Sequence, residues 1–160
     1  MLNKKLSVLI IARNEEKKLD NCINSIGEVD EIVLLLDRTT DESEKIAKKY
    51  NVKIVKGEWE IEGIRRNTGI KHCKNDWILE LDADEKVTTK LINEIKNKIK
   101  NLDKGYFLIP FDNFIGEKKV KYGWGASWGV GAAPRLSHKG CKIWNETQLI
   151  HPSVKLIGKK

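Results

Sequence analysis

The sequence predicts an α/β fold in which a mostly parallel sheet carries helices on both faces. Its N-terminal part contains four short apolar runs rich in β-favouring residues, at 6–11, 31–36, 52–55 and 77–81. Continuous apolar runs of this length are typical of strands that are buried on both faces of a sheet. Helical segments separate the runs, and strands that alternate with helices are joined by crossover connections, which make the sheet parallel.

Helices are predicted at about 16–26, 42–50, 63–73 and 88–100. Gly27 ends the first helix, because glycine readily adopts the conformation that follows a helix. Thr40 or Asp41 caps the second, since either side chain can accept a hydrogen bond from a free backbone N–H. The last helix is amphipathic, with apolar residues on one side at Leu91, Ile92, Ile95 and Ile99.

The last third of the chain differs from the rest. A fifth strand is predicted at 105–111, with Pro110 near its edge. The segment 120–133 is rich in glycine and tryptophan without a clear period, which predicts loops or short, bulged strands. Two more short strands are expected at 134–136 and 141–144. Because no repeat or linker is present, we expect one domain over residues 1–160, with a β-rich C-terminal part.

The composition narrows the class of protein. Of the 160 residues, 40% are hydrophobic and 33% are charged, which is typical of a globular domain. No apolar run approaches the roughly 20 residues that span a bilayer, and no signal-peptide pattern is present, so we expect a cytoplasmic protein. The three cysteines and three histidines show no metal-ligand spacing. The net charge of +7 favours anionic partners, but basic residues interleaved with aromatics, typical of RNA-binding proteins, are missing.

The strongest functional signal is the acidic stretch after the fourth apolar run. This run ends abruptly at Asp82, Asp84 and Glu85. An Asp-x-Asp at the end of a strand presents two carboxylates from one short turn, and Mg²⁺ or Mn²⁺ prefers such oxygen ligands together with substrate phosphates. The carboxyl ends of parallel strands are also where open α/β sheets bind ligands. We therefore predict a metal–diphosphate site, with an ordinary acidic turn as the competing interpretation.

Other loops are expected at the same edge of the sheet. Asn14 and Glu15, after the first strand, can hydrogen-bond a base or ribose, and Asp37, after the second, can accept the imide N–H of uracil. Arg65 and Arg66 lie near the start of a helix, where the dipole disfavours cations, so a diphosphate partner would explain at least one of them. Helix-start preferences and ordinary surface arginines are the competing explanations.

Taken together, these segments resemble family 2 glycosyltransferases, in particular the small bacterial branch that includes lipopolysaccharide core-type transferases. The resemblance is carried by RNEE at 13–16, DRTTD at 37–41, RNTG at 66–69 and DWILELDADE at 76–85. It is strong over residues 6–94 and still recognisable to residue 151. The ordered set is specific, whereas no single motif is.

The resemblance implies the Rossmann-like GT-A fold and a nucleotide-sugar donor bound with Mg²⁺ or Mn²⁺. The family's donor-binding positions correspond to Asn14, Glu15, Asp37, Arg65, Arg66 and Asp82, and its metal-binding position corresponds to Asp84. Among these, Asp37 is the acid that contacts the base, and Asp82 lies at the ribose. Arg38 and Glu42 depart from the family pattern, so contacts with the base are expected to differ.

Glu146 is the candidate catalytic base. In this branch of the family, the base often lies in a His-Glu pair after a strand, and the nearest match is at 144–147, with Asn145 in place of the histidine. Glu146 also follows an apolar run, and the neighbouring Trp144 is able to stack on a sugar ring. The competing interpretation is an exposed acid in a turn.

The implied reaction is a direct displacement at the anomeric carbon of the sugar, with inversion. The metal on Asp84 neutralises charge on the departing diphosphate, and Glu146 takes the proton from the acceptor hydroxyl. Two alternatives stay open. One is a nucleotide-sugar-binding remnant without transfer activity, which Asn145 and the short C-terminus favour. The other is a phosphatase of the haloacid dehalogenase type, which carries its Asp-x-Asp on the first strand rather than the fourth.

The resemblance also implies partners and a location. Residues 1–100 are expected to form the nucleotide-sugar-binding half, and residues 101–160 the acceptor-side half, which is shorter than in many family members. UDP-sugars are the favoured donors, and glycans or lipid-linked molecules are the acceptors, in the synthesis of cell-surface glycans such as lipopolysaccharide. We expect no nucleic-acid partner, and a location in the cytoplasm that includes peripheral association with the inner face of the membrane.

Overall fold

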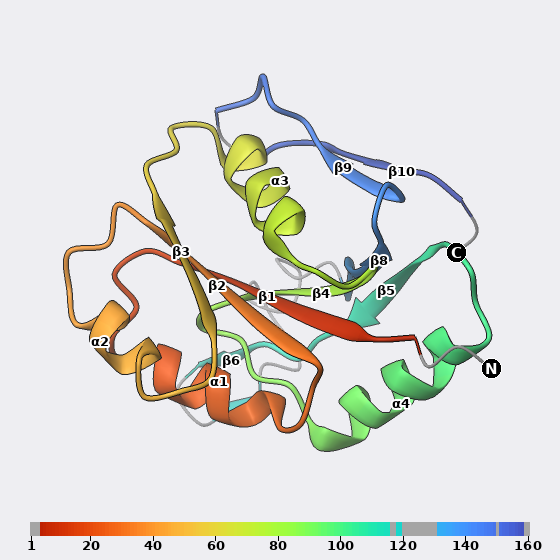
Figure 1. The fold of residues 1–160 in the computed structure, drawn as a ribbon, viewed down its shortest axis with the longest axis horizontal. Coiled ribbons are helices and arrows are strands. Elements are labelled where there is room, and N and C mark those ends of the chain that lie inside the picture. The colour runs from red at the N-terminus through yellow and green to blue at the C-terminus, as the bar shows by residue number, and fades with distance from the viewer. Residues whose placement is uncertain (1–3, 116–117, 120–130, 150, 159–160) are drawn as a thin grey trace.

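A computed structural model describes residues 4–115, 118–119, 131–149 and 151–158 of the chain. Its centre is a six-stranded sheet in the order β3-β2-β1-β4-β8-β5 (Figure 1). These strands are β1 (Leu6–Ala12), β2 (Glu31–Asp37), β3 (Lys53–Gly57), β4 (Trp77–Asp82), β5 (Tyr106–Pro110) and β8 (Ala132–His138). β1 to β4 are mutually parallel, whereas β8 runs antiparallel to both β4 and β5. The predicted, mostly parallel sheet is confirmed.

The central strands are buried because the sheet is covered on both faces. Every residue of β1 is buried, and in the register of the sheet Leu9 lies between Val33 of β2 and Glu80 of β4. A strand covered on both sides needs apolar residues at successive positions, which explains the continuous runs in the sequence. Glu80 is an exception, as a fully buried acid within β4.

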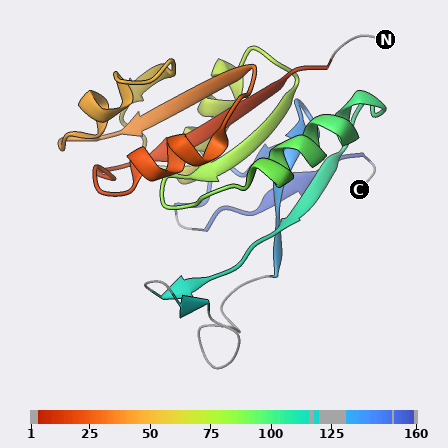
Figure 2. The same ribbon diagram turned by 90° about the horizontal axis from the view of Figure 1, so that it is seen from below.

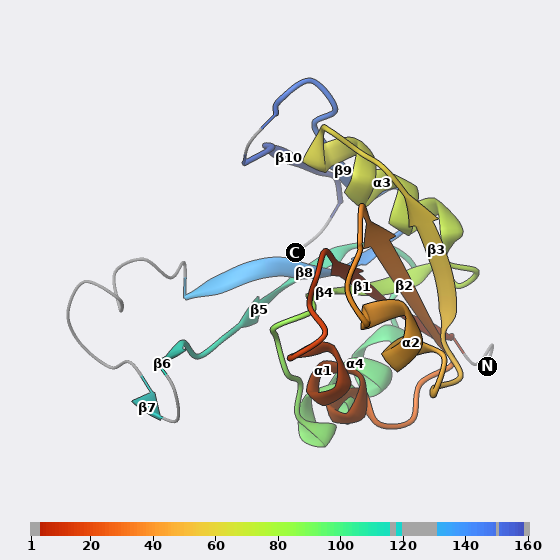
Figure 3. The ribbon, with the colours of Figure 1, turned by 90° about the vertical axis from the view of Figure 1, so that its left-hand side faces the viewer.

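Helices lie on both faces of the sheet, as predicted (Figures 1 and 3). One face carries α1 (Leu19–Ile26), α2 (Ser43–Ala47) and α4 (Thr89–Lys100). The other face carries α3 (Glu62–His72) together with a two-stranded sheet of β9 (Lys142–Trp144) and β10 (Val154–Leu156). Two hydrophobic cores result, one on each face of the central sheet.

Local hydrogen bonds decide where the helices begin and end. α1 begins later than predicted, because a separate turn precedes it, closed by the Lys18 N–H donating to the Glu15 carbonyl at 3.0 Å. Gly27 ends α1 with a φ of 66°, as predicted. α2 is shorter than predicted, and Asp41 supports its start by accepting a hydrogen bond from the Ser43 N–H at 3.0 Å.

The C-terminal part is rich in strands, and two of them, β5 and β8, belong to the central sheet. β8 is longer than the strand predicted at 134–136 and lies between β4 and β5. β6 (Phe114–Ile115) and β7 (Lys118–Lys119) form a small hairpin on an arm that projects from the sheet (Figure 2). Most of the glycine- and tryptophan-rich segment predicted as loops lies outside the described residues. Among the residues that are described, no helix is long and apolar enough to cross a membrane.

Candidate functional site

The loops that follow β1, β2 and β4 meet at one edge of the sheet, as predicted. The side chain of Asn14 accepts a hydrogen bond from the Thr40 N–H at 2.8 Å, which joins the first two loops. The N–H of Ala83, after β4, donates to the Ile11 carbonyl at 3.2 Å. The strand order changes direction between β1 and β4, and such a switch point is where open α/β sheets bind ligands.

An open pocket of about 520 Å³ lies between the loops after β1 and β2. Its lining includes Asn14, Glu15, Lys18 and Asp41. Asn14 and Glu15, both predicted to contact a nucleotide, therefore line the same pocket. A larger pocket of about 790 Å³ lies near the opposite ends of β2 and β3, and it contains none of the predicted site residues.

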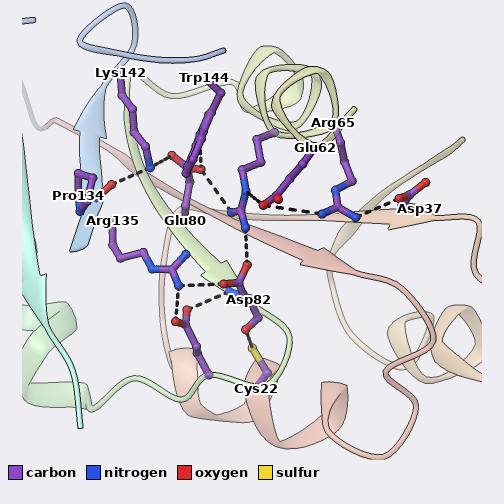
Figure 4. A network of polar contacts seen from close by, with 12 residues as sticks. Cys22, Asp37, Glu62, Arg65, Glu80, Asp82, Pro134, Arg135, Lys142 and Trp144 are labelled. Carbon is purple, nitrogen blue, oxygen red and sulfur yellow. Dashed lines mark hydrogen bonds and ion pairs between the residues drawn. The ribbon is translucent and has the colours of Figure 1, made fainter. Parts of the chain in front are cut away.

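Asp82 ends β4 between two arginines (Figure 4). Arg66 of α3 donates to its carboxylate at 3.1 Å, and Arg135 of β8 donates at 2.8 Å. Burial raises the pKa of Asp82, but the charges and hydrogen bonds of the two arginines outweigh burial and hold the pKa below its usual value. Asp82 is therefore ionised and held in place at neutral pH.

Glu85 folds the acidic loop, residues 82–85, back on itself. Its carboxylate accepts a hydrogen bond from the Asp82 N–H at 2.9 Å and another from the Arg135 guanidinium. Burial raises the pKa of Glu85, and together with the charges of Asp82 and Asp84 it outweighs the opposing effect of Arg135. Arg135 was not predicted from the sequence, because only the position of β8 beside β4 brings it to the acidic loop.

Asp84 differs from its neighbours because its side chain is 55% exposed. Its carboxylate lies 3.7 Å from the Lys18 ammonium, which lies 3.6 Å from the Glu15 carboxylate. A cationic group thus already lies beside two carboxylates at this point, and oxygens of this kind suit Mg²⁺ or Mn²⁺. The described residues contain no group of three or more metal-binding side chains, so a divalent ion here needs further ligands, such as substrate phosphates.

Asp37 ends β2 and is fully buried. Its carboxylate accepts hydrogen bonds from the Trp59 N–H and from the guanidinium groups of Arg38 and Arg65. Burial raises the pKa of Asp37, but these hydrogen bonds outweigh burial and hold the pKa below its usual value. A direct contact between Asp37 and a base stays a prediction. The base would have to displace one of these hydrogen-bond donors.

Arg65 and Arg66, both predicted to lie near a diphosphate, point to different carboxylates. Arg65 pairs with Asp37 at 3.0 Å, whereas Arg66 pairs with Glu62 at 2.7 Å and with Asp82 at 3.1 Å. These acids offset the unfavourable position of two cations in the first turns of α3. Only Arg66 reaches the acidic loop, so it is the better placed of the two for contact with phosphates.

A second polar cluster, around the buried Glu80 and Lys142, lies beside Asp82 (Figure 4). The Glu80 carboxylate lies 2.6 Å from the Lys142 ammonium and accepts a hydrogen bond from Trp144 Nε1 at 3.1 Å. The guanidinium carbon of Arg66 lies 4.8 Å from the centre of the Trp144 ring. Burial lowers the pKa of Lys142 even though the Glu80 charge opposes it. In the sequence, Glu80 is recognisable as an acid inside the apolar run 77–81. That pattern does not predict that its partner is Lys142.

Glu146 follows β9 and is exposed. Its carboxylate accepts a hydrogen bond from the side chain of Asn67 at 2.9 Å. The preceding residue packs tightly on α3, since a Cβ at Gly63 would lie 1.8 Å from the Asn145 carbonyl oxygen. Within the described part of the chain, no hydrogen bond or ion pair connects Glu146 with the acidic loop. Its role as a catalytic base therefore stays a prediction.

Comparison with known proteins identifies the family. The family model described as glycosyl transferase family 2 matches residues 7–146. This chain belongs to glycosyl transferase family 2. The match covers every loop that meets at the carboxyl edge of the sheet, so the resemblance predicted from the motifs is confirmed. Membership of family 2 also removes the support for a phosphatase.

Relatives of this family 2 chain are longer than the chain itself. An uncharacterized glycosyltransferase of Rickettsia bellii is 35% identical over 97 residues, which are 60% of this chain and 33% of the relative. The crystal structure of S. aureus TarS 1-349 matches with a TM-score of 0.59 and 25% identity, over 66% of this chain and 35% of that chain. Its complex with UDP-GlcNAc matches with a TM-score of 0.62 and 23% identity, over 74% and 37% of the two chains. The fold is the GT-A fold, and the chain spans about a third of the length of these relatives.

Proposed function

We propose that this domain transfers a sugar from a nucleotide-diphosphate donor to an acceptor hydroxyl, with a divalent cation at Asp84. One observation carries the proposal: Asp84 is exposed beside Asp82, which two arginines hold at the carboxyl end of β4. An acid that can take a cation and basic groups that suit phosphates thus lie together at the switch point of a family 2 fold.

In this proposal the donor lies along the carboxyl edge of the sheet. Its diphosphate lies near Asp84 and Arg66, and its ribose lies near Asp82. The nucleoside extends over β1 toward the pocket that Asn14 and Glu15 line. A UDP-sugar is the donor that the sequence favours.

The proposed chemistry is a direct displacement that inverts the anomeric carbon. Asp84 would hold the divalent cation, which would neutralise charge on the departing diphosphate. Arg66 and Arg135 add fixed positive charge on the same side of the sugar, where it stabilises negative charge in the transition state. Glu146 is the proposed base, which takes the proton from the attacking hydroxyl.

A nucleotide-sugar-binding domain without transfer activity is the second candidate. Asn145 stands where the family branch often has histidine, and Glu146 is hydrogen-bonded to Asn67 rather than joined to the acidic loop. This candidate predicts donor binding without hydrolysis of the donor and without sugar transfer. Incubation with a donor that binds, followed by chromatographic analysis of the products, distinguishes this candidate from an active transferase.

We propose that the acceptor is a glycan or a lipid-linked molecule of the cell surface, lipopolysaccharide included, and that residues 101–160 provide the acceptor side. The net charge of +7 supports attraction to the anionic inner face of a membrane. Sedimentation with anionic vesicles at low and high salt tests this location. Equal binding to neutral and anionic vesicles would contradict it.

A thermal-shift screen of nucleotide-sugars, each with and without Mn²⁺, tests the proposed donor site. A ligand that binds only the folded state raises the melting temperature, so we expect stabilisation by at least one UDP-sugar that depends on Mn²⁺. A negative result with every nucleotide-sugar would contradict the proposal. Equal stabilisation with and without Mn²⁺ would contradict the proposed dependence of donor binding on a metal.

A further inference from the structure

The carboxylate of Asp37 is saturated with hydrogen bonds from the protein itself. Its Oδ1 accepts from the Trp59 N–H at 3.0 Å and from Arg38 Nε at 3.2 Å. Its Oδ2 accepts from Arg65 Nη1 at 3.0 Å and from Arg38 Nη2 at 3.3 Å. A carboxylate offers about four acceptor positions, and the side chain of Asp37 is 0% exposed. It has no oxygen left for a donor from outside.

Arg38 is held in this position from several sides. Its φ of 47° is a left-handed conformation that is uncommon for residues other than glycine. Its N–H donates to the Gly57 carbonyl at 3.0 Å, and its Nη2 donates to the Trp59 carbonyl at 2.5 Å. The Trp59 ring packs so closely on Gly57 that a Cβ there would lie 2.4 Å from it. These contacts fix Arg38 across the ends of β2 and β3.

The guanidinium of Arg38 also has a side that solvent reaches. The Arg38 side chain is 32% exposed, in contrast to the buried Asp37 beneath it. Its Nη1 atom makes none of the hydrogen bonds found within the described residues. A molecule that reaches Arg38 therefore meets the N–H donors of its guanidinium, and none of the carboxylate oxygens of Asp37.

The proposed function brings a nucleobase to this point, and the inference rests on it. β1 lies between β4 and β2 in the sheet, so the end of β2 is two strand spacings, about 10 Å, from the end of β4. With the diphosphate at Asp84, a nucleoside that crosses β1 has its base near Arg38.

We infer that Arg38 is a specificity-determining residue of the donor site, because it covers Asp37 and becomes the polar group that the base meets. A guanidinium only donates hydrogen bonds, so it recognises the carbonyl oxygens of a pyrimidine and ignores the imide N–H. Uracil and cytosine share the O2 carbonyl, whereas only uracil carries a proton on N3. The site therefore accepts both pyrimidine diphosphates and tolerates a blocked N3.

Calorimetry of the wild-type chain with UDP, CDP and N3-methyl-UDP, each with Mn²⁺, tests this inference. N3-methylation removes the imide donor and keeps both carbonyl oxygens. We expect the three dissociation constants to agree within about tenfold. Weaker binding of N3-methyl-UDP than of UDP by more than about tenfold would overturn the inference and leave the proposed function standing. Failure of all three to bind would overturn both.

Arg38→Gly gives a second readout, because it uncovers Asp37. Glycine adopts a φ of 47° without strain, so we expect the variant to fold. With Asp37 uncovered, UDP is expected to bind more tightly than N3-methyl-UDP by roughly 10- to 150-fold, the effect of one hydrogen bond to a charged group. An unchanged ratio of the two affinities would overturn the inference.

Arg38→Lys is the matched control. Lysine keeps the positive charge but lacks the planar fork that covers both oxygens of Asp37. A ratio of affinities between those of the wild type and of Arg38→Gly is expected. A ratio above that of Arg38→Gly would contradict the covering role of the guanidinium. The comparison of UDP, CDP and N3-methyl-UDP on the wild-type chain tests the inference even where a variant fails to fold.

Discussion

Replacing Lys142 with methionine is expected to destabilise the protein, because it leaves the Glu80 carboxylate unpaired inside the fold. The Lys142 and Glu80 side chains are 2% and 0% exposed, and their charged atoms lie 2.6 Å apart. Methionine keeps the volume of the lysine stem but supplies no charge. Breaking a buried ion pair on one side typically costs about 3–5 kcal/mol of unfolding free energy, because the remaining charge stays desolvated.

Two neighbours keep the loss near the lower end of that range. Trp144 Nε1 retains its hydrogen bond to Glu80. Arg66 Nη1 lies 4.0 Å from the Glu80 carboxylate and has no hydrogen-bond partner in the described part of the chain, so it can move onto the freed acid. We expect a loss of about 3 kcal/mol in unfolding free energy. For a chain of this length, that loss lowers Tm by roughly 6–12 °C.

Urea unfolding followed by tryptophan fluorescence measures this change as a lower midpoint at constant m-value. The double variant Glu80→Gln with Lys142→Met removes both charges and is expected to regain most of the loss. Lys155→Met is the matched control, since Lys155 is exposed on β10, and it should change stability by less than about 0.5 kcal/mol. Equal midpoints for Lys142→Met and the wild type, or no recovery in the double variant, would refute the reasoning.

Four further predictions follow from the site. Asp84→Ala should abolish Mn²⁺-dependent binding of UDP in calorimetry without lowering Tm, because the side chain is exposed; unchanged Mn²⁺-dependent affinity would contradict this. Glu146→Gln should reduce sugar transfer about 10²–10⁴-fold with donor affinity nearly unchanged; wild-type turnover would exclude Glu146 as the base. Gly63→Ala should lower Tm, because the new Cβ would lie 1.8 Å from the Asn145 carbonyl oxygen; a Tm equal to that of the wild type would show that this segment moves freely. Because the folded pKa of Asp82 is held below its usual value of 3.8, its contribution to stability is complete above pH 3.8 and is lost as pH falls through the folded pKa. The urea midpoint should therefore fall on acidification below about pH 4, and less steeply in Asp82→Asn; equal slopes would contradict the assignment.

Local sequence was sufficient to predict the four parallel strands and the acidic loop. The run 77–81 is apolar at all positions but Glu80, because both faces of β4 are covered, and Asp82 and Asp84 follow where the strand ends. Gly27 ends α1 for an equally local reason, since glycine accepts a φ of 66°. Such features depend on residues that are neighbours in the chain, so they can be predicted without knowing the fold. The family resemblance then added the GT-A fold and the roles expected of the site residues.

Only the tertiary structure decided which charged groups meet. Arg135 lies 53 positions from Asp82, and Trp144 lies 64 positions from Glu80. These contacts form because β8 inserts beside β4 and the segment with β9 packs on α3. No local pattern predicts such contacts, since they depend on how distant segments pack.

The three aspartates at the edge of the sheet show this division most clearly. In the sequence each is an acid at the end of a strand. In the structure Asp37 is buried and saturated, Asp82 is held between two arginines, and Asp84 is exposed. The sequence by itself determined where the carboxylates lie along the chain. The fold decided which of them is exposed, because burial and neighbouring donors depend on how distant segments pack.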